Sequence, residues 1–65
     1  MTFGQKVRYV RKKLDYTQTE FAKVLSVSFA TVNRWENGRV APSVLAAKAF
    51  YEFCEDSFIS FPSEE

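Results

Sequence analysis

The sequence has no histidine and a single cysteine, Cys54, among its 65 residues. These scarcities exclude a disulfide framework within the chain, a histidine-based catalytic triad and a cysteine–histidine metal cluster. There is also no signal peptide and no run of 18 apolar residues, so we expect a soluble, cytoplasmic protein with no membrane segment. The sequence therefore predicts no metal, no cofactor and no enzymatic activity.

The stretch from Thr17 to Gly38 predicts two short helices joined by a tight bend. Thr17 followed by Glu20 matches a capping box, so we expect the first helix to begin at Gln18. Its buried stripe, at helical spacing, would be Phe21, Ala22, Val24 and Leu25.

The second helix of this pair should run from Phe29 to Glu36, with Ser28 as its cap. Val32 and Trp35 would face inward, and Asn37-Gly38 marks the helix end, where glycine suits the left-handed conformation. Two helices this short are marginal in water, so other segments must pack against them.

Two further helices flank this pair. The spacing of Phe3, Val7, Val10 and Leu14 predicts a helix from Phe3 to Leu14. After Pro42, Ser43 can cap a fourth helix, from Val44 to about Cys54, which is too apolar for one core face to absorb. We expect a domain at residues 1–55 and a partly packed tail at 56–65 with a disordered tip.

Charge is small overall, at +1, but unevenly distributed. Residues 1–48 hold all nine basic residues and three acidic ones, a net charge of +6, whereas residues 49–65 carry −5. One end of the molecule is therefore suited to face phosphate while the other is kept away from it. Solvated charge spread over the surface is the alternative explanation.

The run TQTEFAKVLSVSFATVNRWENG, preceded by VRYVRKKL, resembles the helix-turn-helix of the phage repressor and Cro-like family, also called XRE. The resemblance spans about Val7 to Tyr51 and implies an all-α fold, a compact bundle of four to five helices like the lambda repressor DNA-binding domain. Relatives usually have glycine at the positions of Asp15 and Ser26. We expect Asp15 to keep the left-handed turn. If the backbone at Ser26 also needs positive φ, the serine adds strain on the order of 1 kcal/mol.

The resemblance also implies which residues meet double-stranded DNA. In such motifs the second helix enters the major groove. Arg34 would pair with guanine, Asn33 with adenine or phosphate, and Phe29 or Ala30 would cover a thymine methyl group. A solvated Arg34 and a Phe29 packed on a neighbouring helix are the alternatives. The full set of expected base contacts is Ser28, Phe29, Ala30, Asn33 and Arg34.

Other residues of the motif have implied positional roles. Gln18 resembles a phosphate contact at a helix start, and Thr17, Asn37 and Arg39 complete the expected phosphate set, Thr17 being chiefly a cap. Arg11 and Glu36 resemble a buried ion pair that sets the angle of the second motif helix. Surplus apolar residues predict a homodimer interface made by Phe50, Tyr51, Phe53, Phe58 and Phe61.

We therefore expect a sequence-specific DNA-binding transcriptional regulator that reads a palindromic operator as a homodimer. An antitoxin or restriction-control protein of the same fold, which also binds a protein partner such as a toxin, remains an alternative. A protein-interaction module that lost DNA binding is a third. Against it, Gln18, Arg34, Asn37 and Arg39 retain donors on one surface.

Overall fold

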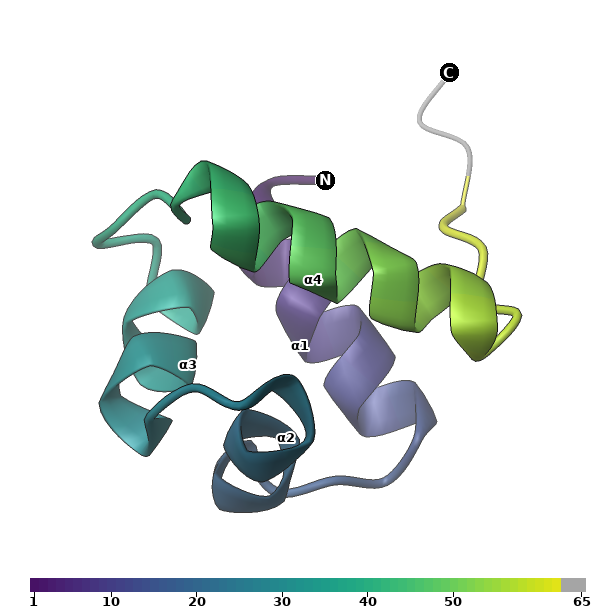
Figure 1. Cartoon of the computed structure of the whole chain (residues 1–65), viewed down its shortest axis with the longest axis horizontal. Coiled ribbons are helices and arrows are strands. Elements are labelled where there is room, and N and C mark those ends of the chain that lie inside the picture. Colours follow the sequence, from purple (N-terminus) through teal and green to yellow (C-terminus); the bar gives the residue numbers. More distant parts are fainter. Residues whose placement is uncertain (63–65) are drawn as a thin grey trace.

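The computed structural model, which describes residues 1–62, contains four helices and no strand in that range. They are α1 (Phe3–Lys13), α2 (Gln18–Leu25), α3 (Phe29–Glu36) and α4 (Val44–Asp56) (Figure 1). The predicted all-α fold is confirmed, and α2 and α3 have the predicted starts. Helix α1 stops one residue early, whereas α4 continues two residues past Cys54.

Each helix begins at a hydroxyl cap. The side chains of Thr2, Thr17, Ser28 and Ser43 accept a hydrogen bond from the backbone amide three residues further on. At Thr17 the capping box is complete, because the Glu20 carboxylate also accepts from the Thr17 amide at 2.8 Å. The predicted caps are confirmed, and they account for where the helices start.

Each of the four helices is followed, one or two positions after its last residue, by a residue with positive φ, and only one of these is glycine. The angles are 61° at Asp15, 58° at Ser26, 72° at Gly38 and 55° at Phe58. In each case the following amide reaches back to a carbonyl in the last turn, for example Val27 to Ala22 at 2.9 Å and Ile59 to Cys54 at 2.9 Å. The turns expected at Asp15 and Ser26 are retained without glycine, and Phe58 was not expected to join them.

The core is built from two side chains of every helix. Its buried members are Val7 and Val10 of α1, Phe21 and Ala22 of α2, Val32 and Trp35 of α3, and Phe50 and Cys54 of α4. Val24, expected in the stripe of α2, is instead 40% exposed. Helix α3 packs against both α1 and α2, and α4 closes the core (Figure 1).

Phe50 is a core residue, so its assignment to a dimer interface is wrong. It is 0% exposed, and its ring meets Phe3 of α1 at 5.2 Å and Phe21 of α2 at 6.4 Å between centroids. Phe53 and Phe61 also pack against the core and are only partly exposed. Of the expected interface residues, Tyr51 and Phe58 have exposed side chains.

Helix α1 approaches the end of α3 as closely as the backbones allow. A Cβ placed on Gly4 would lie 1.9 Å from the carbonyl oxygen of Trp35. Gly4 is therefore a contact point between two helices, and this contact fixes how α3 sits on α1.

The segment after α4 is partly packed, since Ile59 and Phe61 lie against the core. The expected disordered tip includes residues 63–65, which lie outside the described residues. Within the described part, no helix combines the length and apolarity that crossing a membrane requires.

Candidate nucleic-acid interface

The outward face of α3 carries the side chains expected to meet bases. Ser28, Phe29, Ala30 and Arg34 are all exposed, and Phe29 is 51% exposed. Val32 and Trp35 occupy the opposite, buried face. The structure therefore brings four of the five expected base-contact residues together on one accessible surface, where Phe29 is half-exposed.

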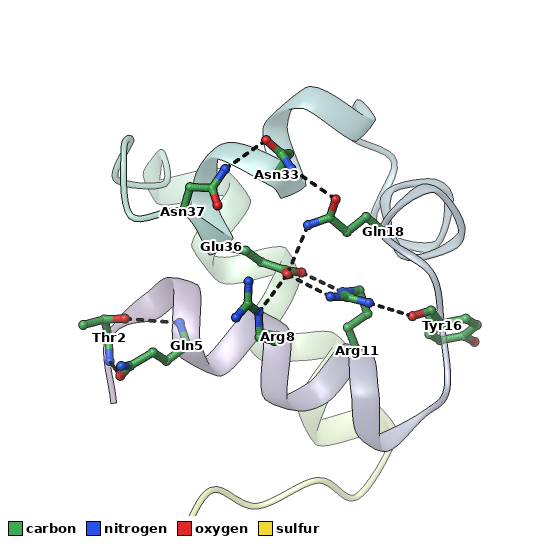
Figure 2. A network of polar contacts seen from close by, with 9 residues as sticks. All are labelled: Thr2, Gln5, Arg8, Arg11, Tyr16, Gln18, Asn33, Glu36 and Asn37. Atoms are coloured by element: carbon green, nitrogen blue, oxygen red, sulfur yellow. Dashed lines mark hydrogen bonds and ion pairs between the residues drawn. The ribbon is translucent and has the colours of Figure 1, made fainter.

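The orientation of α3 depends on the carboxylate of Glu36, which is 0% exposed. Arg11 of α1 holds it with two hydrogen bonds, from Nε to Oε2 at 2.7 Å and from Nη2 to Oε1 at 2.9 Å. Arg11 also donates from Nη1 to the carbonyl oxygen of Tyr16 at 3.1 Å. The expected ion pair is present, and Arg11 thereby ties α1 and the connection before α2 to the last turn of α3 (Figure 2).

Burial by itself raises the pKa of Glu36, but the hydrogen bonds from Arg11 and Gln18 and the positive charge of Arg11 lower it by more. The pKa of Glu36 therefore lies below its ordinary value. The hydrogen bond to Glu36 likewise raises the pKa of Arg11. Both groups are charged at neutral pH, and a buried charge with this many partners is satisfied.

Arg8 is a second arginine at the same carboxylate, and sequence reasoning missed it. Its Nε lies 3.3 Å from Oε1 of Glu36, and its side chain is 54% exposed, against 14% for Arg11. Arg8 and Arg11 are three residues apart on one helix, a spacing that places both on one face. That spacing was a signal in the sequence. The cluster has two positive charges for one negative charge, so it is basic overall.

Gln18 and Asn33 extend this network to the outer face of α3. Gln18 donates from Nε2 to Oε1 of Glu36 at 3.1 Å and accepts from Nδ2 of Asn33 at 3.2 Å. Asn33 in turn accepts from Nδ2 of Asn37 at 3.0 Å. Three of the expected DNA-contact residues thus form one chain of amides that starts at the buried carboxylate (Figure 2).

The remaining expected phosphate contacts lie at the edges of this face. Thr17 is exposed and serves as the cap of α2, with its hydroxyl accepting from the Glu20 amide at 3.1 Å. Arg39 is exposed just beyond α3, as is Asn37. No group of three or more acidic, cysteine or histidine side chains able to hold a metal ion occurs among residues 1–62.

Comparison with known proteins agrees with this geometry. The sequence model of the family described as Helix-turn-helix matches residues 7–53. The HTH-type transcriptional regulator DicA of Escherichia coli (strain K12) is 36% identical over 67 aligned positions, which cover 100% of this chain and 50% of DicA. The chain thus spans about half the length of that relative. No solved structure matches. The chain belongs to the helix-turn-helix family, in its repressor and Cro-like (XRE) branch.

Proposed function

We propose that this protein is a sequence-specific DNA-binding transcriptional regulator that inserts α3 into the major groove of a palindromic operator. One observation carries the proposal: Arg34, Ala30 and Phe29 are exposed on one face of α3, while Glu36 on its other side is held by α1 and α2. Arg34 has no ion-pair partner among residues 1–62. A helix that presents such an arginine suits a base edge, because arginine pairs with guanine O6 and N7 in a bidentate manner.

Charge supports the same docking. The net charge of +6 in residues 1–48 and of −5 in residues 49–65 favours an approach with the motif toward phosphate. Gln18, Asn37 and Arg39 lie around the outer face of α3, where they would bond to backbone phosphates and fix the register without reading sequence. The relative named as a transcriptional regulator supports this role.

We propose further that two copies bind the operator, and that they meet at a surface other than the one expected from the sequence. The segment that follows α3 exposes three apolar side chains, Val40, Val44 and Leu45, which are 50%, 86% and 79% exposed. They lie in the loop after α3 and in the first turn of α4. Contiguous exposed apolar patches mark interaction sites, and we infer that these three side chains form one. A two-fold contact there would set two α3 helices one helical turn of DNA apart, roughly 34–36 Å.

Selection of bound sites from random duplex DNA tests the proposal. We expect enrichment of a palindrome and a steep loss of affinity with salt, since each neutralised phosphate adds about 0.9 to the log–log slope. Enrichment of a single, non-repeated half-site would retain DNA reading but reject the dimer. Failure to enrich any sequence, with affinity independent of salt, would reject the function.

A further inference from the structure

The chain of side-chain amides that starts at Glu36 has a fixed direction. An amide has a donor end and an acceptor end, and its orientation is decided by its partners. Glu36 is an ionised carboxylate and can only accept, so Gln18 must turn its NH2 group toward it. The carbonyl oxygen of Gln18 then faces α3, and Asn33 must turn its own NH2 group toward Gln18.

The same logic continues along α3. With its nitrogen held by Gln18, Asn33 has its oxygen on the other side, where it accepts from Asn37. Each NH2 group has two hydrogens and each carbonyl oxygen two lone pairs. Asn33 uses one hydrogen to donate to Gln18 and one lone pair to accept from Asn37. One N–H and one lone pair remain, and their order along the outer face of α3 is fixed.

We propose that Gln18 and Glu36 are positioning residues for base recognition. They set the donor–acceptor order of Asn33, so that Asn33 pairs with an adenine on one DNA strand and not with an adenine on the other. Asparagine pairs with adenine by donating to N7 and accepting from N6. An A·T pair and a T·A pair present these two groups in opposite orders across the major groove. An asparagine that is free to rotate about its last bond suits both, whereas a fixed asparagine suits one.

This inference rests on the proposed function and gives Gln18 a second task beside phosphate contact. The two tasks differ chemically. A phosphate contact needs the remaining N–H of Gln18, whereas orienting Asn33 needs only an acceptor beside Nδ2 of Asn33. Glutamate at this position supplies the acceptor and no donor, and Arg8 and Arg11 provide the positive charge to balance it. Methionine, of similar length, supplies neither.

The experiment compares Gln18→Met with Gln18→Glu in site selection from random DNA. We expect Gln18→Met to lose the preference between A·T and T·A at one base pair of each half-site, by about fivefold or more. Gln18→Glu should keep that preference while binding all sequences more weakly. If Gln18→Met keeps the preference, or if both variants lose it equally, the inference is wrong.

A measurement on the wild-type protein without DNA tests the chain directly, whether or not a variant folds. Scalar couplings across hydrogen bonds identify which nitrogen donates to which carbonyl. We expect couplings from Nδ2 of Asn33 to the Gln18 side-chain carbonyl and from Nδ2 of Asn37 to that of Asn33. Couplings in the reverse direction, or none, would overturn the inference. If the wild type enriches no DNA, the proposed function is wrong. The couplings still test the direction of the hydrogen bonds between the side-chain amides.

Discussion

Arg11 and Glu36, 25 positions apart in the sequence, form a two-pronged ion pair with nitrogen–oxygen distances of 2.7 and 2.9 Å. The pair joins α1 to the last turn of α3, next to the close contact between Gly4 and Trp35. The helix proposed to read DNA is therefore held at its C-terminal end by the polar contacts of Glu36 with α1 and α2 and by a close backbone contact with α1.

Removing Arg11 should destabilise the fold strongly. Arg11→Ala leaves the buried Glu36 carboxylate with one exposed arginine and one amide, and breaking a buried pair in this way costs about 3–5 kcal/mol. Arg8→Ala is the matched control, because Arg8 is 54% exposed and its contact is longer; we expect less than about 1 kcal/mol. Urea unfolding of both variants measures the difference. Equal losses would mean that Arg11 has no special role.

The stability should fall in acid in a way that depends on Glu36. A carboxylate whose pKa is lowered in the folded state stabilises that state fully above its unfolded pKa, about 4.3. This contribution is lost as the pH falls through the folded value. We therefore expect the stability difference between wild type and Glu36→Gln to be largest above about pH 5 and to shrink below about pH 4.

Glu20→Gln is the control for this pH dependence, because the pKa of the exposed Glu20 is also lowered, by the hydrogen bond from the Thr17 amide. NMR titration of the Glu36 side-chain carboxyl carbon gives its pKa directly and needs no variant. A pKa of Glu36 at or above its ordinary value would contradict the prediction.

Substituting Gly4 should separate steric contact from helix propensity. Alanine normally stabilises a helix position by about 0.5–1 kcal/mol relative to glycine. At Gly4 the added Cβ meets the Trp35 carbonyl oxygen, so we expect Gly4→Ala to cost about 1–3 kcal/mol instead. Gly38→Ala is the contrast, since nothing lies within 4 Å and only its φ of 72° opposes the change, at about 1 kcal/mol. A thermal midpoint raised by Gly4→Ala would refute the close contact.

Replacing Arg34 and replacing Arg39 should weaken DNA binding in different ways. Arg34 lies on the outward face of α3, so Arg34→Ala should cost about 1–3 kcal/mol at the preferred site and relax the preference at one base pair per half-site. Arg39→Ala should weaken all sequences about equally and reduce the salt slope by about 1. Titrations with specific and random duplexes measure the loss of affinity for each. An equal loss on both duplexes for Arg34→Ala would make Arg34 a phosphate contact.

The two candidate dimer surfaces can be separated by single substitutions. Leu45→Glu should dissociate the dimer, because a charge would enter the proposed apolar contact around Val44. Phe58→Ser tests the tail surface expected from sequence, and we expect no effect on association. Both side chains are exposed, at 79% and 95%, so neither change should unfold the protein. Sedimentation at rising concentration measures association. If Phe58→Ser alone dissociates the dimer, the interface lies at the tail, as expected from the sequence.

The sequence by itself determined where the helices begin and, to within two residues, where they end. Caps such as Thr17 and Ser28 act through hydrogen bonds three residues away, and the turns at Asp15 and Ser26 through local backbone geometry. Interactions of such short range depend only on residues that are neighbours in the sequence, so the sequence predicts them. The Arg11–Glu36 pair was expected only from the family resemblance, since no local pattern joins residues 25 positions apart.

The tertiary structure alone decided which side of an almost wholly apolar helix is buried. In α4 the composition did not separate Phe50, which is 0% exposed, from Leu45, which is 79% exposed, because burial depends on where α1 and α2 lie. The domain boundary at residues 55–56 stays a prediction, although it falls within the last turn of α4. Nor could the sequence show that one carboxylate orients three amides, because the direction of that chain follows from contacts between α1, α2 and α3.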